Sequence, residues 1–421
     1  MNAVQIVGAG LAGIAAAIKL TQAGRKVVIF DQAEHAGGRC RSYRDAVLDR
    51  QIDNGNHLLL SANWAALEFL ETVGSAGSLA SPTRAVFPFV DLASGKRWTV
   101  TFRDGPLLGR VPLPPSGIPD VTLSQLLGAL KLRSVEGKTV AEALDTSSPL
   151  YKRFWQPLAV AALNTECEAG AAKLLWPVVR ETVLRGGRFC KPMVAREGLS
   201  QSFIDPALAW LKSRGAELRL GWGLREIALE GERVAGLNFA RNGQVSVDGA
   251  VVIALPPASA QRVVPGLDAP IESRAIVNGH FRVNGPMPRL PFDSPLIGVL
   301  GGTAEWLFLR GDVISVTVSA ADRLAEDSED SIAARMWRDI LAALALSQHG
   351  GLPPYRIVKE KRATFAQTPA SLKHRAKPRT GWSNLFLAGD WTDTGLPATI
   401  ESAIRSGFAA ADVVINSDIS P

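Results

Sequence analysis

The sequence predicts an α/β fold in which a Rossmann-like dinucleotide-binding domain is interleaved with a mixed α+β substrate domain of antiparallel sheet plus helices. The first observation is an apolar strand over residues 4–7 that runs into Gly8-Ala9-Gly10-Leu11-Ala12-Gly13 and an apolar helix. The second is another apolar strand, residues 27–31, which ends in an acid. The third is a strand-like segment near the other end of the chain, residues 384–390. Related patterns at both ends favour a domain assembled from distant segments.

Each glycine of the first motif has a mechanical role. Gly8 allows a tight turn, Gly10 lets the backbone approach a pyrophosphate, and Gly13 lets the helix pack closely against the strand. The pyrophosphate would lie at the helix N-terminus, where free N–H groups and the helix dipole favour negative charge. Asp31, 23 residues after Gly8, would accept hydrogen bonds from ribose hydroxyls. The motif therefore predicts dinucleotide binding rather than a glycine turn without a ligand.

Two further segments distinguish between cofactors. An NAD site ends with the acid, but this chain continues with Gly37-Gly38-Arg39, a second turn whose arginine can face phosphate. Near the C-terminus, Gly389-Asp390 follows the apolar segment, and Pro397-Ala398-Thr399-Ile400 opens a helix whose N-terminus can face a ligand. The two ends of the chain would then hold one long cofactor, and FAD is long enough.

Together these motifs resemble the FAD-dependent amine oxidase and phytoene desaturase superfamily of flavoproteins. Within it, Asp53-Asn54-Gly55-Asn56-His57-Leu58-Leu59-Leu60 and residues 387–403 are similar to signatures of the hydroxysqualene dehydroxylases, the hopanoid-associated group also called squalene-associated FAD-dependent desaturases. Two departures are visible: Asn56 stands where glutamine is usual, and Ser402 stands where glycine is usual. Because serine lacks glycine's backbone freedom, the chain near Ser402 would approach the flavin differently.

The resemblance implies an enzyme that removes the hydroxyl of hydroxysqualene and forms squalene. Loss of the allylic hydroxyl as water would leave a delocalised cation, and reduced flavin can deliver hydride to it, so the reaction needs a proton donor. We expect His57 or Asp53 in that role and regard Glu166 as less suited; the alternatives are a structural hydrogen bond for His57 and loop ordering for Asp53. The residues expected to hold FAD are Gly8, Gly10, Leu11, Ala12, Gly13, Asp31, Gly37, Gly38, Arg39, Asn56, His57, Gly389, Asp390, Pro397, Ala398, Thr399 and Ile400.

Composition agrees with a large enzyme of a reducing compartment. The chain has 421 residues, its three cysteines form no even disulfide framework, and its five histidines are scattered, so no metal site is expected. It begins with a strand and has no run of 18 apolar residues, which predicts a cytoplasmic protein without a spanning helix.

A net charge of +6 is typical either of spare surface lysines and arginines or of attraction to anionic lipid on the inner face of the cytoplasmic membrane. No basic run or zinc finger favours nucleic acid as a partner.

The interleaved architecture predicts five consecutive parts. The expected FAD-binding parts are residues 1–80, 196–265 and 356–421, and the expected substrate parts are residues 81–195 and 266–355. In the first substrate part, residues 106–115 and 123–132 are apolar and end near Lys131 and Arg133. This pattern suits a helix lying in a membrane interface, although a core-packing helix with a solvated basic end is the favoured interpretation.

Three alternatives stay open. A carotenoid-type desaturase or an amine oxidase would use the same flavin site, and an amine oxidase would pair Trp391 with Phe365 or Trp382 against the flavin. A non-catalytic prenyl-lipid escort, like the Rab GDP-dissociation inhibitors, is disfavoured because an escort need not keep both flavin-binding segments. The electron donor is not identified, since no second GxGxxG motif for a nicotinamide cofactor is present.

Overall fold

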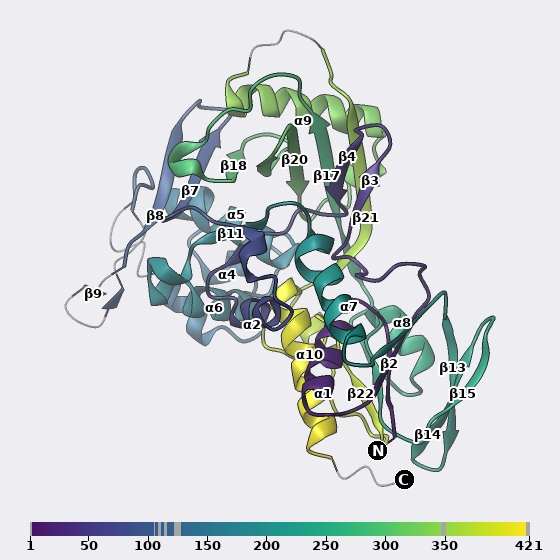
Figure 1. Ribbon diagram of the computed structural model, residues 1–421. Coiled ribbons are helices and arrows are strands. Elements are labelled where there is room, and N and C mark those ends of the chain that lie inside the picture. The colour runs from purple at the N-terminus through teal and green to yellow at the C-terminus, as the bar shows by residue number, and fades with distance from the viewer. Residues whose placement is uncertain are drawn as a thin grey trace.

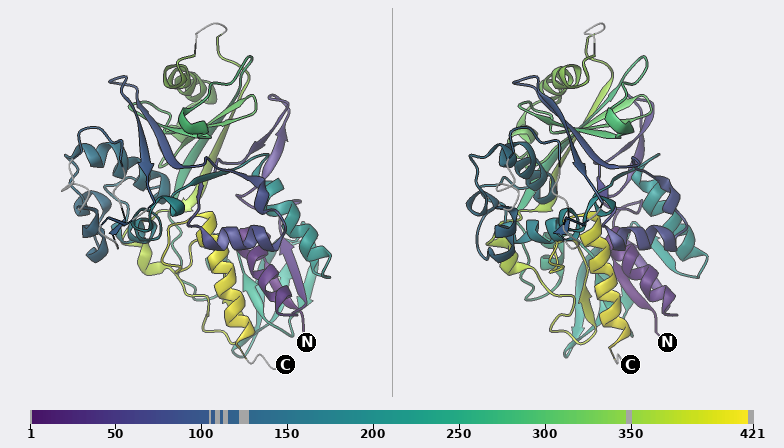
Figure 2. Two further views of the ribbon diagram at one scale, coloured as in Figure 1. Left: turned by 60° about the vertical axis from the view of Figure 1, so that its left-hand side comes forward. Right: turned by 90° about the vertical axis from the view of Figure 1, so that its left-hand side faces the viewer.

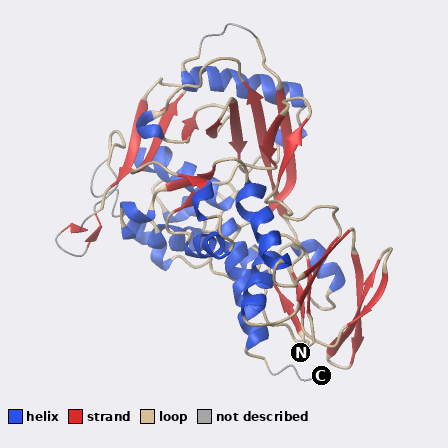
Figure 3. Cartoon of the chain, in the orientation of Figure 1, coloured by secondary structure: helices blue, strands red, loops and turns tan. Residues whose placement is uncertain are grey.

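A computed structural model describes residues 2–104, 106–107, 111–112, 116–121, 128–346 and 351–417 of the chain. In Figure 3 the strands gather in two main regions at opposite ends of the molecule, with most helices between and beside them. The two regions are a five-stranded parallel sheet and a seven-stranded, mostly antiparallel sheet. The predicted fold class is therefore confirmed.

The five-stranded sheet is built from segments scattered along the chain. Its order is β12-β2-β1-β16-β22, with β12 at Glu217–Leu220, β2 at Val27–Asp31, β1 at Val4–Val7, β16 at Val251–Ile253 and β22 at Leu385–Leu387. Strand β1 pairs in parallel with β2 on one side and β16 on the other, so the first glycine motif emerges from the middle of the sheet. This position, at the carboxyl ends of central strands, is where dinucleotides bind in such sheets.

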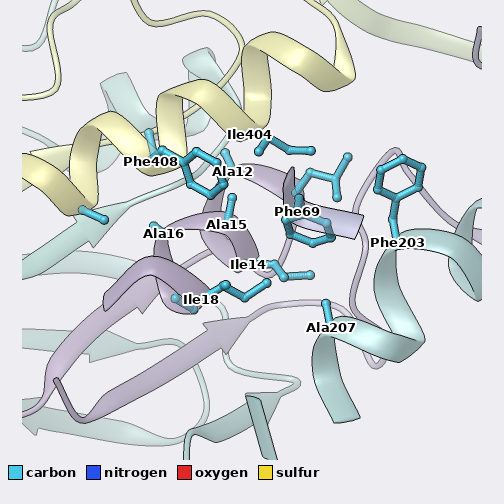
Figure 4. Packing of buried hydrophobic residues seen from close by; sticks show 14 of the residues in the cluster. Ala12, Ile14, Ala15, Ala16, Ile18, Phe69, Phe203, Ala207, Ile404 and Phe408 are labelled. Atoms are coloured by element: carbon cyan, nitrogen blue, oxygen red, sulfur yellow. The ribbon is translucent and has the colours of Figure 1, made fainter. Parts of the chain in front are cut away.

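Helices from both ends of the chain pack together beside this sheet. They are α1 (Leu11–Gln22), α2 (Trp64–Thr72), α7 (Asp205–Lys212) and α10 (Ile400–Ile415). Figure 4 shows alanines of α1 between Ile404 and Phe408 of α10, while Phe69 and Phe203 close the other side. A Cβ atom on Gly407 would lie 2.2 Å from the carbonyl oxygen of Ala12, so only glycine permits this close approach. The two views of Figure 2 show α1 and α10 side by side.

The seven-stranded sheet belongs to the substrate domain (Figure 1). Its order is β21-β17-β20-β19-β18-β7-β8, with β21 at Tyr355–Phe365, β17 at Ser273–Arg282, β20 at Val313–Val318, β19 at Trp306–Arg310, β18 at Leu296–Leu300, β7 at Ala85–Asp91 and β8 at Arg97–Phe102. Helix α9 (Glu329–Leu344) covers one face of this sheet. Its N-cap is Ser328, which accepts a hydrogen bond from the Ser331 N–H.

Smaller elements complete the structure. A meander of β13 (Leu224–Glu230), β14 (Arg233–Phe239) and β15 (Gly243–Ser246) precedes β16, which leads to α8 (Pro257–Val263). The helical part of the substrate domain contains α4 (Val140–Ala143), α5 (Gln156–Leu163) and α6 (Ala172–Glu181), with a π-turn at Tyr151–Trp155 before α5. Short pairings join β3 (Ser42–Asp45) to β4 (Arg50–Asp53), β9 (Pro106–Leu107) to β10 (Val111–Pro112), and β11 (Pro192–Ala195) to both β5 (Leu59–Leu60) and β6 (Leu79–Ala80).

The predicted boundary at residue 356 does not coincide with the change of sheet. Strand β21 pairs with β17 over most of its length and is an edge of the seven-stranded sheet. The chain returns to the five-stranded sheet only at β22. Most of residues 106–115 and 123–132, for which an interfacial helix was considered, lie outside the described residues.

Candidate active site

Two glycine turns lie side by side at the carboxyl edge of β1. Gly10 and Gly37 form a parallel bridge, and the Gly37 N–H donates to the Ala9 carbonyl at 2.8 Å. Gly37 and Gly38 have φ values of 105° and 57°, which favour glycine. The structure thus brings together the two turns that the sequence predicts to face phosphate.

The N-terminus of α1 has room for a ligand. The N–H groups in the first turn of any helix have no intrahelical partner. In α1 no side chain caps them either, so they can donate to a ligand. A Cβ atom on Gly8 would lie 2.4 Å from the Ala254 carbonyl oxygen, and one on Gly13 would lie 1.9 Å from the Gly8 oxygen, so packing requires both glycines. A Cβ atom on Gly10 would meet nothing within 4 Å. Packing therefore does not explain Gly10, whereas a pyrophosphate against the helix terminus does.

Asp31 lies at the end of β2 next to this turn. Its carboxylate accepts hydrogen bonds from the Ala9 N–H at 2.7 Å and the Ala33 N–H at 2.9 Å. A carboxylate has about four acceptor positions, so two of them are available to ribose hydroxyls. The arrangement fits the role expected for Asp31.

Arg39 and Asp390 connect the two ends of the chain. The Arg39 guanidinium lies 2.8 Å from the Asp390 carboxylate and also donates to the Ala363 carbonyl. The Asp390 side chain is 8% exposed, and its charge raises the pKa of Arg39. Gly389 precedes it, and a Cβ atom there would lie 2.4 Å from the Trp391 indole nitrogen. Both predicted cofactor-binding side chains are thus held in one ion pair beside the glycine turns.

The start of α10 differs in detail from the expected open helix terminus. Thr399 caps the helix by accepting a hydrogen bond from the Ser402 N–H, and the Ala398 N–H donates to Gln367 Oε1 at 2.9 Å. Gln367 is fully buried and also donates to the Leu163 carbonyl in the helical part. Gln367 therefore anchors residues 397–400 to the helical part of the predicted substrate domain. It lies outside the sequence motifs and was not among the predicted site residues.

Glu401, in the C-terminal motif, acts on a helix rather than on a ligand. Its carboxylate accepts hydrogen bonds from the N–H groups of Ala65 and Ala66 at the start of α2, at 3.1 and 2.9 Å. It also accepts from Arg405 at 2.7 Å. Burial raises the pKa of Glu401, and these donors oppose that shift.

Trp391, which the amine-oxidase alternative would place against the flavin, is a core residue. It is 1% exposed, and its indole N–H donates to the Leu255 carbonyl at 2.9 Å. Phe365 is also buried in this core, and among the described residues Trp391 has no ring contact with Phe365 or Trp382. The aromatic pair considered for an amine oxidase is therefore not formed, because the side chain after Asp390 points into the protein core.

The loop of residues 53–57 lies between the dinucleotide site and the seven-stranded sheet. Asp53 accepts from Ser42 Oγ at 2.5 Å, from the Leu199 N–H at 2.9 Å and from Arg310 at 2.6 Å. Three donors on one buried carboxylate are typical of a structural anchor rather than of a proton donor. The arrangement favours loop ordering, the alternative role considered for Asp53.

His57 lies between two charged pairs. Burial lowers its pKa to about 4; the charge of Asp53 opposes this shift, and the charge of Arg39 adds to it. The free imidazole is therefore neutral at pH 7 and can donate one ring N–H as a hydrogen bond. Glu166, the third candidate, lies on an exposed turn after α5.

Asn56 faces polar side chains of the seven-stranded sheet. Its amide donates to Thr317 Oγ1 at 3.0 Å, and Thr317 donates to Asn278 Oδ1 at 2.8 Å. Next to this group, His280 Nδ1 lies 2.8 Å from Ser315 Oγ. Thr317, Asn278, His280 and Ser315 were not among the predicted site residues; the available signal was a polar residue at every second position of otherwise apolar segments.

A small cavity of about 30 Å³ separates this loop from the sheet. Its polar lining comes from Asp53, Asn56, His57, Arg310 and Ser315. Its apolar lining comes from Val194, Ala195, Leu199, Pro295, Phe308 and Leu309. The cavity therefore adjoins the dinucleotide site through His57 and combines a polar wall with a hydrocarbon wall.

The parallel sheet, the uncapped helix terminus and the paired glycine turns define a dinucleotide-binding protein. The family model for flavin containing amine oxidoreductases matches residues 11–415. The chain therefore belongs to the flavin-containing amine oxidoreductase family.

Two curated relatives extend over nearly the whole chain. Hydroxysqualene dehydroxylase of Rhodopseudomonas palustris is 45% identical over 415 residues, 98% of each chain. That of Sinorhizobium fredii is 42% identical over 418 residues, again 98% of each chain. Among solved structures, cyclohexylamine oxidase from Brevibacterium oxydans has a TM-score of 0.71 at 16% identity, with 98% of each chain covered, and shows the same fold. Within the family, the chain therefore belongs to the hydroxysqualene dehydroxylases, so it is a flavin-dependent oxidoreductase and not a non-catalytic escort.

Proposed function

We propose that this chain is an FAD-dependent hydroxysqualene dehydroxylase that reduces hydroxysqualene to squalene in squalene and hopanoid biosynthesis. The observation that carries the proposal is the 45% identity, over 98% of both chains, to an enzyme of that name. The cavity beside the dinucleotide site supports it, because its two walls suit an oxygen function attached to a hydrocarbon chain.

The choice of FAD among flavins rests on the two turns. FMN has one phosphate and a ribityl chain but no ribose, whereas the helix terminus at Gly10 suits a pyrophosphate and Asp31 suits the ribose of the adenosine half of FAD. Arg39 and Asp390 would lie farther along the same cofactor, toward its flavin end. We therefore infer that the adenosine half of FAD binds at α1 and β2.

The overall reaction replaces a C–OH bond by a C–H bond. Bound and reduced, the flavin supplies the hydride, and one proton completes the water that leaves. His57 lines the cavity and is near enough to Asp53 and Arg39 to be affected by their charges, so we assign its ring N–H the hydrogen bond to the departing oxygen. Asp53 keeps the loop of His57 in place. The apolar wall, including Val194 and Phe308, excludes water from the reacting carbon.

The test is an anaerobic incubation of purified, photoreduced holoenzyme with hydroxysqualene. Formation of squalene together with reoxidation of the flavin absorbance spectrum is the expected result. Bound flavin that stays reduced, with no squalene, would contradict the proposal and favour a desaturase or an amine oxidase. A parallel sample of oxidised enzyme is the control and should form no squalene. The natural electron donor is a separate question.

Membrane attachment stays a prediction. None of the helices in the described part of the chain is long and apolar enough to span a bilayer. A cytoplasmic location, with contact to the inner membrane surface, agrees with an isoprenoid substrate and a net charge of +6. Co-sedimentation with anionic lipid vesicles, compared with neutral ones, would test this contact.

A further inference from the structure

One face of the seven-stranded sheet is apolar, whereas the other carries several polar side chains. Apolar side chains of β17, β19 and β20, including Val277, Leu307 and Val316, pack on the same side as α9. The opposite face of these strands carries polar side chains, all of them buried except the part-buried Arg310, and we call this set the polar row. The polar row consists of Asn278, His280, Arg310, Ser315 and Thr317.

The polar row is deeply buried. His280 is 0% exposed, Asn278 is 1% exposed and Ser315 is 3% exposed. Burial of polar groups costs free energy unless each group has a hydrogen-bond partner. Yet His280 Nε2 lies beside the backbone of Asp53 without a well-formed hydrogen bond in the described part of the structure. A sheet face with this composition is expected where a polar ligand group binds.

The cavity lies where the polar row meets the loop of residues 53–57. Arg310 and Ser315 line it from the sheet, and Asn56 and His57 line it from the loop. A volume of about 30 Å³ is large enough for one water-sized group, the size of a hydroxyl. The adjoining apolar wall would contact the carbon atoms that carry this group.

Arg310 has donors available for such a group. One Nη atom donates to Asp53 Oδ2 at 2.6 Å, and this is its one side-chain hydrogen bond found within the described ranges. A guanidinium has five N–H donors in a rigid plane, so Asp53 fixes its orientation while other donors stay available. The side chain is 23% exposed, and the residue lines the cavity.

We propose that Arg310 is a specificity-determining residue that binds the hydroxyl oxygen of the substrate in this cavity. The inference rests on the proposed function and adds to it the residue that distinguishes the alcohol from its hydrocarbon product. Arg310 holds the oxygen and Asp53 orients Arg310; neither residue transfers the proton.

The test compares the binding of the alcohol with that of the hydrocarbon. Oxidised holoenzyme lacks the hydride, so dissociation constants for hydroxysqualene and squalene can be measured in the same detergent from the change in flavin absorbance. Arg310→Met should weaken hydroxysqualene binding roughly 10- to 100-fold, as expected for a hydrogen bond to a charged group, and change squalene binding by less than about twofold. Arg310→Lys, which keeps a charged donor, should restore part of the selectivity.

The matched control is Arg50→Met, which removes a 2.8 Å ion pair with Asp312 away from the cavity. It should change neither dissociation constant. If Arg310→Met does not fold because Asp53 loses its partner, Asp53→Asn combined with Arg310→Met removes both charges and should show the same loss of selectivity.

Equal weakening of both ligands by Arg310→Met, or no weakening of either, would overturn the inference. Equal affinity of the unaltered enzyme for alcohol and hydrocarbon would also overturn it. Selective binding of the alcohol without formation of squalene by the reduced enzyme would instead refute the proposed function and leave the recognition role of Arg310 intact.

Discussion

The Arg39 guanidinium and the Asp390 carboxylate lie 2.8 Å apart although 351 residues separate them in the chain. One side chain follows the second glycine turn, and the other follows β22 of the same sheet. Since Arg39 also donates to the Ala363 carbonyl at the end of β21, one guanidinium joins the N-terminal segment, the C-terminal segment and the substrate sheet. The predicted cofactor site is therefore held together by three segments that lie far apart in the sequence.

Arg39→Leu should therefore weaken flavin binding by at least about tenfold, since it removes the cation that joins the two ends of the chain and leaves the buried Asp390 carboxylate without this ion pair. The measurement is the flavin-to-protein absorbance ratio after gel filtration at increasing dilution. Lys19→Met is the control, because it removes a 2.7 Å ion pair to Asp412 that also joins the two ends of the chain but lies on the outer side of α1 and α10. Equal flavin retention in both variants would refute the role given to Arg39.

Gly10→Ala should impair flavin binding without destabilising the apoprotein, whereas Gly8→Ala should destabilise the apoprotein itself. An added Cβ atom at Gly10 meets no protein atom within 4 Å, so the apoprotein should keep its melting temperature and lose flavin affinity. At Gly8 the added atom would lie 2.4 Å from the Ala254 oxygen, and φ is 113°, so the apoprotein itself should be destabilised. Thermal melting of both apoproteins and flavin titration separate the two effects. A Gly10→Ala protein that binds flavin normally would contradict the placement of the pyrophosphate.

His280 should make stability depend on pH. Burial lowers its pKa from 6.5 to about 4, with Asp53, Asp45 and Arg310 as the charged groups nearby. As the pH falls, His280 is protonated near pH 6.5 in the unfolded chain but only near pH 4 in the folded protein. Its contribution to stability is therefore complete above about pH 6.5 and is lost as the pH falls toward 4. By pH 5 the loss amounts to about 2 kcal/mol.

His280→Gln removes this titration, so its melting temperature should fall less between about pH 7 and pH 5 than that of the unaltered protein. His374→Gln, which replaces an exposed histidine beside Asp268, is the control and should keep the full pH dependence. An unchanged pH dependence in His280→Gln would show that the buried ring is not the group responsible.

Glu401→Ala should destabilise the protein through α2 rather than through the chemistry. The variant loses the acceptor for the Ala65 and Ala66 N–H groups and one of the two carboxylates paired with Arg405, the other being Glu181. Removal of such a helix cap costs about 1–2 kcal/mol. The melting temperature should fall, and the rate of squalene formation per bound flavin should stay within about twofold. A large loss of rate at full flavin occupancy would instead place Glu401 at the reacting centre.

Several features were predictable because they depend on local sequence. The spacing of Gly8, Gly10 and Gly13 predicts a strand, a turn and a helix, and these elements form as expected. The recurrence of apolar strands at both ends of the chain predicts an interleaved domain, which the order of the five-stranded sheet confirms. The aromatic pair of the amine-oxidase alternative could not be judged from sequence, because Trp391 follows the predicted site residue Asp390, whereas consecutive side chains along an extended segment point in different directions.

Residue types at fixed spacing along single segments were enough to predict the dinucleotide motif, the fold class and the relationship to a flavoprotein family. Three other features became clear only in the folded chain: Asp53 is an anchor, Trp391 belongs to the core and Arg310 faces the loop of His57. The physical reason is that Asp53 and Arg310 come from strands of different sheets, 257 residues apart, and nothing in either local sequence specifies which face of the other strand it meets.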